Sequence, residues 1–197
     1  RDSQLTASAL VKQAREIMLE EKSDNINDDL SMAKQKLNEA KKLNQNLDIE
    51  EDKQEIAQAL IERGVNLVQA DKIEQALIAY KTAEEFYPEL KIDSESWLTL
   101  CLRGTLNKQV NDVLFACENA VKTSTEKDEI ELAKGVRGIA KALTGNFDDA
   151  IKDLEILISN PNILDYELKT KFKQWIETLK KGENPFTDEV LEELKNE

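Results

Sequence analysis

The sequence predicts an all-α protein, and two observations carry this prediction. The first is composition: aromatic residues make up 5% of the chain, with six glycines and three prolines, so residue types favoured in strands and turns are scarce. The second is the stretch GVNLVQADKIEQALIAYKTAEEFYP at 64–88, which has small and apolar residues at helical spacings. Weaker copies of this stretch recur at 100–125 and 137–161.

The charge pattern limits the partners that the chain is expected to have. The formal net charge is −13, and acidic residues are spread along the whole sequence. Nucleic acids and anionic membranes attract basic surfaces, so we expect the chain to bind neither of them. We find no run of about 18 apolar residues and expect a cytoplasmic protein. The chain begins at Arg1, so we expect it to be a segment of a longer protein or a processed one.

The residue types needed for catalysis or metal binding are scarce. The sequence contains no histidine, which removes the commonest general base and the commonest metal ligand. Its two cysteines, Cys101 and Cys117, form no CxxC motif. We therefore expect no enzymatic activity, no metal and no cofactor.

The three copies follow one another at a constant spacing. The corresponding positions of the second helices hold Ala76, Val113 and Ala150, and successive members are 37 residues apart. Two helices approach closely only where side chains are small, so we expect close contacts at Ala76, Ala150, Gly64 and Gly138. A single helical hairpin cannot bury its apolar face alone, whereas stacked hairpins form a continuous core.

The first copy resembles a tetratricopeptide repeat. Its positions of resemblance are Leu60, Gly64, Leu67, Ala76, Tyr80, Ala83 and Pro88. The departures are Arg63 and the missing aromatic residue at Leu67. Trp97 supplies the expected aromatic at the start of the second copy. This resemblance implies a right-handed superhelical stack of antiparallel helix pairs, an α-solenoid.

This interpretation divides the chain into consecutive parts of one continuous domain. The repeats as a whole span 57–164, and the parts are an N-terminal helical hairpin or degenerate repeat (1–56), three repeats (57–93, 94–130 and 131–164), and a capping helix with a short terminal helix (165–197). A polar loop, KSDNIND, is predicted within the first hairpin at 22–28. The stretch QNLDIEED at 45–52 is predicted to link that hairpin to the repeats.

Helix ends and the C-terminal segment carry further local signals. Asp71 with Glu74 is typical of a capping box, and Gly145-Asn146 indicates the end of one helix and the start of the next. The capping helix has one apolar face, formed by Leu168, Phe172, Trp175, Ile176 and Leu179. Thr187 is a suitable N-cap for a final helix at 188–195, with Phe186 placed to pack on Leu191.

The resemblance also implies a concave groove lined by the first helix of each pair, where extended peptides or helices bind. The groove residues would be Ile61, Val65, Val68, Leu98, Leu102, Leu132 and Ile139, with Thr105, Gly135 and Ala142 beside them. None is Lys, Arg or Asn, so a clamp for a C-terminal carboxylate is not expected.

A long apolar groove favours a protein-interaction module that binds a helix or peptide. The occupant could be a partner protein, another domain of the parent chain, a second copy in a homodimer, or residues 188–195 of this chain. In the alternative interpretation, tight curvature closes the groove and the same residues are core. The competing function is a structural spacer or oligomerisation segment without a specific ligand.

Two further features complete the expectations. Cys101 and Cys117 take facing positions within one helix pair, where a disulfide is conceivable, but two buried thiols are the interpretation we prefer. The stretches 138–155 and 174–189 resemble the tails of large multidomain cyanobacterial proteins that carry WD40, NTPase or caspase-like modules. This second resemblance implies an interaction segment of a larger signalling protein.

Overall fold

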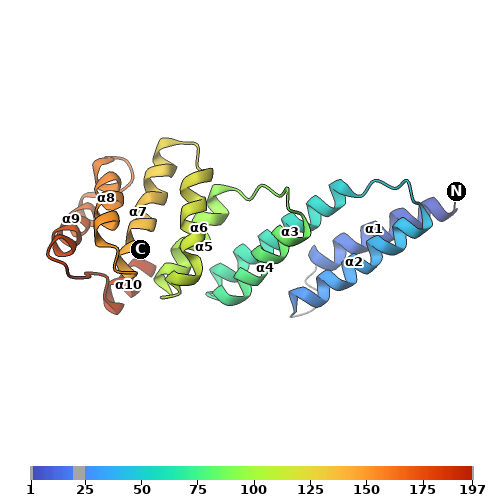
Figure 1. Cartoon of the computed structure of the whole chain (residues 1–197), viewed down its shortest axis with the longest axis horizontal. Helices are drawn as coiled ribbons and strands as arrows, with labels where there is room; N and C mark the ends of the chain where they lie inside the picture. The colour runs from blue at the N-terminus through green and yellow to red at the C-terminus, as the bar shows by residue number, and fades with distance from the viewer. Residues whose placement is uncertain (1, 20–24, 197) are drawn as a thin grey trace. The chain divides into compact units, whose positions relative to one another are not determined.

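The computed structural model describes residues 2–19 and 25–196, and within them every regular element is an α-helix (Figure 1). The ten helices of this described part are α1 (Asp2–Leu19), α2 (Ile26–Leu43), α3 (Glu50–Gln69), α4 (Ile73–Phe86), α5 (Ser94–Leu106), α6 (Val110–Thr123), α7 (Lys127–Leu143), α8 (Phe147–Ser159), α9 (Tyr166–Lys180) and α10 (Asp188–Lys195). The all-α prediction is confirmed. Residues 22–24 of the predicted polar loop lie outside the described residues, and α2 already begins at Ile26.

The chain forms two compact units. Unit 1 comprises Arg1–Leu67 and Glu74–Lys91, and unit 2 comprises Val68–Ile73 and Ile92–Glu197. In unit 1, α1 and α2 pack as a hairpin. The buried positions of α1 are Ala7, Val11, Ala14 and Met18, whose spacing places them on one face of the helix.

Helix α3 begins earlier than the sequence suggested. Residues 50–52 were expected to belong to a connection, but they form the first turn of α3, and the Asp48 carboxylate accepts a hydrogen bond from the Glu50 N–H at 3.0 Å. Three acidic residues in this first turn interact favourably with the helix dipole. Arg15 of α1 pairs with Glu55 of α3 and lies 3.4 Å from Asp52. The connection between α2 and α3 is therefore shorter than expected.

Unit 2 is a succession of packed hairpins. Helix α5 packs on α6, α7 packs on α8, and contacts between α6 and α7 and between α5 and α7 join the two pairs (Figure 1). Helix α9 packs on α8, and α10 packs on α5. The predicted apolar face of α9 is confirmed: Phe172, Ile176 and Leu179 are buried in the same cluster as Leu154 and Leu157 of α8.

The 37-residue spacing is repeated in the backbone of four turns. The residues with positive φ in the described chain are Asp71, Lys108, Gly145 and Gly182, at φ of 57°, 63°, 82° and 81°. Their N–H groups donate, in the same order, to the carbonyl oxygens of Val68, Thr105, Ala142 and Leu179. Each set advances by 37 residues, so α9 ends in the same way as α3, α5 and α7.

The turn at Asp71 corrects one local prediction. A capping box would need Asp71 in extended backbone before the helix, but its φ of 57° is left-handed. Its carboxylate instead accepts a hydrogen bond from Asn107 Nδ2 at 2.9 Å. At the third turn Gly145 ends the turn and Asn146 caps α8 by accepting from the Asp149 N–H, as the sequence indicated.

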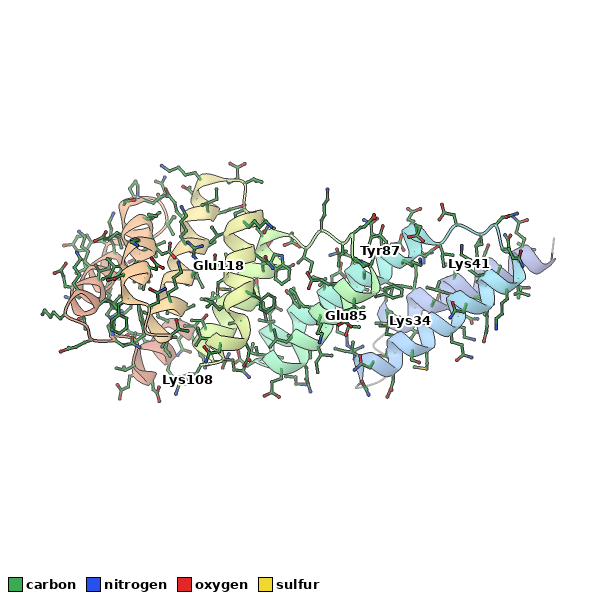
Figure 2. The ribbon with its side chains drawn as sticks, in the orientation of Figure 1. Lys34, Lys41, Glu85, Tyr87, Lys108 and Glu118 are labelled. Carbon is green, nitrogen blue, oxygen red and sulfur yellow. A yellow bond between two sulfur atoms is a disulfide. The ribbon has the colours of Figure 1, made fainter. Side chains whose placement is uncertain are left out.

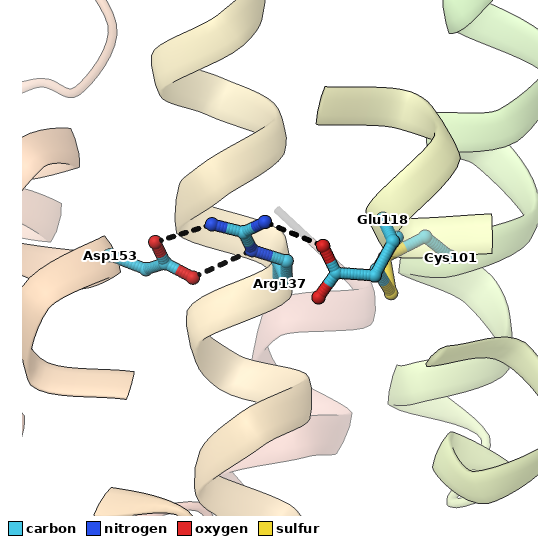
Figure 3. Close-up of a disulfide and its surroundings, with 5 residues drawn as sticks. Cys101, Glu118, Arg137 and Asp153 are labelled. Atoms are coloured by element: carbon cyan, nitrogen blue, oxygen red, sulfur yellow. Dashed lines mark hydrogen bonds and ion pairs between the residues drawn. A yellow bond between two sulfur atoms is a disulfide. The ribbon is translucent and has the colours of Figure 1, made fainter. Parts of the chain in front are cut away.

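One contact position recurs within three helix pairs, each time between residues 16 apart. A Cβ built on Gly64 would lie 2.7 Å from the Tyr80 ring, and one on Gly138 would lie 2.9 Å from Leu154 Cγ. These are the close approaches that the sequence predicted. In the middle pair the equivalent residues, Cys101 and Cys117, form a disulfide with their Cα atoms 4.9 Å apart (Figure 3). The expectation of two buried thiols is therefore wrong.

Candidate functional site

The seven predicted groove residues differ widely in exposure. Ile61, Val68 and Ile139 are buried, Val65, Leu98 and Leu102 are half-buried, and Leu132 is 37% exposed. Ile61 and Val65 belong to unit 1, and the other five belong to unit 2. The candidate site is therefore built here from the residues of unit 2 alone.

Two helices of unit 2 supply one apolar face, which we call the α5–α7 face. On α5, Leu98, Leu102 and Leu106 follow one another at intervals of four residues and share one side of the helix. On α7, Leu132 and Ile139 are seven residues apart and also share a side. Leu102 and Leu106 of α5 pack in one apolar cluster with Ile139 of α7, so the two rows meet at that end.

Helix α10 covers one end of this face. Leu191 of α10 is 1% exposed and belongs to one cluster with Leu106 of α5 and with Ile139 and Ala142 of α7. Leu102, Leu143, Val190 and Leu194 pack around this cluster. We call this part the covered end and the part with Leu98 and Leu132 the open end. At the covered end, α10 packs on α5 and shares the apolar cluster that contains Ile139.

An ion pair lies near each end of α10. Lys108 Nζ lies 2.6 Å from the Asp188 carboxylate at the start of the helix, and Lys171 Nζ of α9 lies 2.6 Å from Glu193. Figure 2 marks Lys108, which stands in the turn between α5 and α6. Thr187 caps α10 by accepting a hydrogen bond from the Val190 N–H, as predicted.

The segment that leads into α10 is anchored by aromatic packing. Phe186 is 4% exposed, and its ring centroid lies 5.3 Å from that of Trp175 on α9. Trp175 also contacts Phe172, with the ring centroids 4.8 Å apart and nearly perpendicular. Phe186 and Leu191 belong to the same buried cluster. The anchor directs α10 back onto α5.

Two other predicted groove residues have different roles in the structure. A Cβ on Gly135 would meet Leu157 of α8 at 2.5 Å, so Gly135 faces the partner helix of its own pair and not the groove. Thr105 is fully buried, and among the described residues its Oγ1 has no hydrogen-bond partner. Val68 and Ala142 take the equivalent positions in the neighbouring turns and are also fully buried. Side chains at this position belong to the core.

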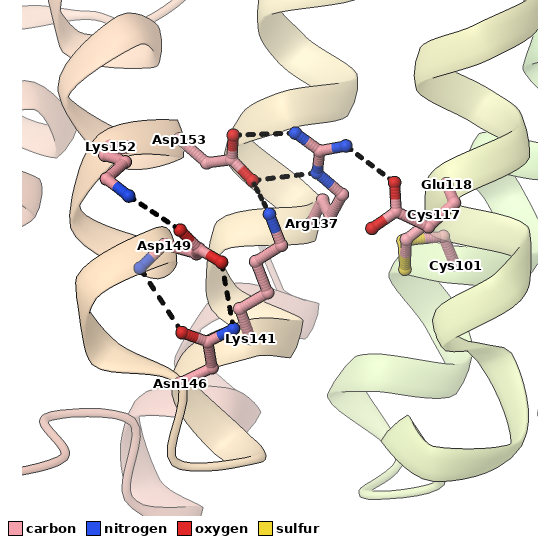
Figure 4. A network of polar contacts seen from close by, with 9 residues as sticks. All are labelled: Cys101, Cys117, Glu118, Arg137, Lys141, Asn146, Asp149, Lys152 and Asp153. Carbon is pink, nitrogen blue, oxygen red and sulfur yellow. Dashed lines mark hydrogen bonds and ion pairs between the residues drawn. A yellow bond between two sulfur atoms is a disulfide. The ribbon is translucent and has the colours of Figure 1, made fainter.

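A polar network fixes α7 between α6 and α8 (Figures 3 and 4). Arg137 of α7 donates to both carboxylate oxygens of Asp153 on α8, at 2.8 Å each, and to Glu118 of α6 at 2.7 Å. Lys141, one turn further along α7, donates to Asp153 at 2.9 Å. These charged hydrogen bonds join α7, which carries part of the α5–α7 face, to its neighbours α6 and α8.

The network also changes the acidity of its members. Hydrogen bonding to Asp153 raises the pKa of the Arg137 guanidinium above its usual value, against the effect of burial. Burial alone would raise the pKa of Asp153, but hydrogen bonds from Arg137 and Lys141 outweigh it, so the pKa is lowered. Arg137 and Asp153 therefore remain charged near neutral pH, and their hydrogen bonds hold α7 to α8.

No sequence pattern singled out Lys108, Lys171 or the Arg137 network as elements of the site. A weak signal existed, because Arg137 and Lys141 stand one helical turn apart and oppose an acidic α8. In the described ranges, no cluster of three or more His, Cys, Asp or Glu side chains is arranged to hold a metal ion. Nor does any helix drawn from those residues have both the length and the apolar character required to cross a membrane.

No protein-family model matches the chain, and neither a curated protein nor a solved structure matches it.

Proposed function

We propose that this chain is a protein-interaction module that binds an amphipathic helix of a partner protein on the α5–α7 face. The observation that carries the proposal is the docking of α10: the face already holds one amphipathic helix through apolar side chains and two flanking ion pairs. This arrangement is the helix-in-groove mode of recognition.

The exposure of Leu132 supports the same function. Leu132 lies on the same row of α7 as the buried Ile139 and is 37% exposed. It therefore extends the apolar face beyond α10. Leu98 continues the row on α5 in the same direction. A partner helix that contacts Leu98 and Leu132 at the open end would bury apolar surface that α10 leaves accessible.

The test is a selection of helical peptides that bind the full-length chain, followed by fluorescence anisotropy with the selected peptides. Leu132→Asp places a charge on the open end without disturbing a buried residue, and we expect it to weaken binding about ten-fold or more. Tyr166→Asp is the matched control, because Tyr166 is 88% exposed and lies outside the face on α9. Equal loss of binding in both variants would contradict the assignment of the face.

The alternative function, a structural spacer, makes the opposite prediction. If the chain is only a spacer, no selected peptide should show binding that Leu132→Asp weakens. Any binding seen at high peptide concentration would then be non-specific. Light scattering of the same samples would separate an oligomerisation segment from a monomeric spacer, because only the former changes mass with concentration.

A further inference from the structure

We propose that the partner helix of the α5–α7 face extends from the open end onto the covered end, where it shares the recognition pattern of α10 and exchanges with it. This inference rests on the proposed function and names both its ligand class and its regulation. The ligand is an acidic amphipathic helix with apolar residues at positions i, i+1 and i+4, a carboxylate at i−2 and a second carboxylate at i+3.

The pattern follows from the residues of α10 that make contacts. Val190, Leu191 and Leu194 supply the apolar positions i, i+1 and i+4. Asp188 at i−2 pairs with Lys108, and Glu193 at i+3 pairs with Lys171. The two remaining glutamates of the helix are exposed. A partner with this pattern reproduces the contacts that the covered end already makes.

The charges at the covered end select the sign of the ligand. The protein carries a net charge of −13, so a basic helix would be attracted by its surface in general. At the covered end, however, Lys108 and Lys171 border the apolar cluster and would repel a basic helix. The local cations therefore favour an acidic helix at this place against the average charge of the molecule.

Several features make α10 an exchangeable occupant. It has eight residues, of which only Leu191 is buried, whereas isolated helices shorter than about 12–15 residues are marginal in water. Its ion pairs are partly exposed, since the side chains of Lys108 and Asp188 are 53% and 79% exposed, and such pairs contribute little. Phe186, which precedes the helix, is held independently by Trp175. Residues 187–196 can therefore leave while their anchor stays bound.

Exchange implies competition between a tethered and a free helix. The tether gives α10 a high effective concentration at the covered end. The apparent affinity for an external helix is therefore its intrinsic affinity multiplied by the fraction of molecules in which α10 is undocked. A change that undocks α10 should therefore strengthen the binding of an external helix.

The experiment uses the full chain and a fluorescein-labelled peptide with the sequence of residues 187–196, TDEVLEELKN. Leu191→Glu in the protein removes the one buried contact of α10. We expect this variant to bind the peptide at least about ten-fold more tightly than the unaltered chain. Glu192→Gln is the matched control on the same helix: Glu192 is exposed and pairs with Lys195 of α10 itself, so peptide binding should not change.

Charge reversal then tests the recognition chemistry. Adding Lys108→Glu to the Leu191→Glu variant should weaken peptide binding about five-fold or more, and a peptide with Asp188→Lys should restore it. If Lys108→Glu weakens peptide binding and the Asp188→Lys peptide does not restore it, Lys108 is not the cation that pairs with the carboxylate at position i−2.

Hydrogen–deuterium exchange on the unaltered chain gives a measurement that needs no variant. The amides of α10 should exchange at least about ten-fold faster than those of α9, because α10 opens while α9 stays folded. Equal protection of the two helices would make α10 an integral part of the core and overturn the proposal, whatever the variants do.

The outcomes separate this inference from the proposed function. If the Leu191→Glu variant folds by circular dichroism but does not bind the peptide, while selected peptides still depend on Leu132, then the exchange is wrong and the interaction module stands. If neither kind of peptide binds, both proposals fail. Binding that appears only with a concentration-dependent dimer would assign the face to α10 of a second copy and overturn the partner assignment.

Discussion

Arg63 Nη1 donates a hydrogen bond to Asp29 Oδ2 at 2.7 Å, and this ion pair within unit 1 is buried, with side chains that are 7% and 0% exposed. The pair joins α3 to α2. Arg137 lies two 37-residue steps after Arg63 and also pairs with a carboxylate of the preceding helix, Glu118 of α6. Leu100 takes the intermediate position. The same helix position thus serves twice to bond a first helix to the hairpin before it.

We expect Arg63→Ala to lower the free energy of unfolding by about 3–5 kcal/mol, because it leaves the Asp29 carboxylate buried without this partner. The measurement is urea unfolding followed by circular dichroism. Lys81→Ala, which removes the exposed pair between Lys81 and Glu85, is the control and should change stability by less than about 0.5 kcal/mol. A similar small effect for Arg63→Ala would show that the pair is not stabilising.

The disulfide should contribute measurably to the stability of the α5–α6 hairpin. Closing a loop of this size by a disulfide stabilises a protein by about 3 kcal/mol in the chain-entropy model. Reduction with dithiothreitol should lower the free energy of unfolding by that amount, and the double variant Cys101→Ser with Cys117→Ser should no longer respond to the reductant. Thiol titration of the unfolded, unreduced chain should detect no free thiol.

The chain itself suggests a better replacement for the disulfide. Cys101→Gly with Cys117→Leu copies the equivalent contact between Gly138 and Leu154. We expect this variant to be about 1 kcal/mol or more stable than the double serine variant, which buries two hydroxyl groups in fully buried positions. Equal stability of the two variants would mean that the three contact positions are not interchangeable.

Thr105→Val should stabilise the protein by about 1 kcal/mol. The Thr105 hydroxyl is buried without a hydrogen-bond partner, and the equivalent positions hold the apolar residues Val68 and Ala142. Thermal and urea unfolding both measure the effect. Thr125→Val in the exposed connection between α6 and α7 is the control and should be close to neutral. Destabilisation by Thr105→Val would indicate a hydrogen bond to the hydroxyl in solution.

The Asp153 network should make part of the stability dependent on pH. Because the folded pKa of Asp153 is lowered, its contribution is present above the unfolded value of about 4 and is lost as the pH falls through the folded pKa. Asp153→Asn should cost about 3 kcal/mol near pH 7, and this difference from the unaltered chain should shrink steadily in more acidic solution.

Urea midpoints measured at a series of pH values from neutral to acidic check this prediction. Asp149→Asn is the control: the pKa of Asp149 is also lowered, mainly by its hydrogen bond from Lys152, but the group is exposed and should have little effect on stability. A difference between Asp153→Asn and the unaltered chain that stays constant with pH would contradict the ionised state assigned to Asp153.

Periodic features were the part of the fold that the sequence predicted well. The 37-residue spacing from Ala76 to Val113 to Ala150 anticipated three fully buried positions on the second helices. The amphipathic α9 was predicted from its local periodicity. The Thr187 cap of α10 was predicted from the residue type that commonly makes this local hydrogen bond. The start of α3 was misplaced because acidic residues suit both a loop and the first turn of a helix.

Features that depend on tertiary distances could not be predicted in the same way. The facing positions of Cys101 and Cys117 followed from the repeat, but whether they bond depends on a Cα separation that no spacing reveals. The predicted groove residues of unit 2 include Leu102 on α5 and Ile139 on α7, and their exposure depends on where α10 docks. That docking is set by Phe186, Trp175 and two lysines on other elements, which the pattern of α10 alone does not contain.

The bond between Cys101 and Cys117 also has a mechanical consequence. If the two ends of the chain were pulled apart, the 16 steps between these residues could not extend, and about 55 Å of contour length would stay hidden. Stretching with optical tweezers should therefore give a shorter fully extended chain before reduction than after it. In the oxidised protein, the segment between the two cysteines would keep a fixed length while the rest of the unfolded chain extends.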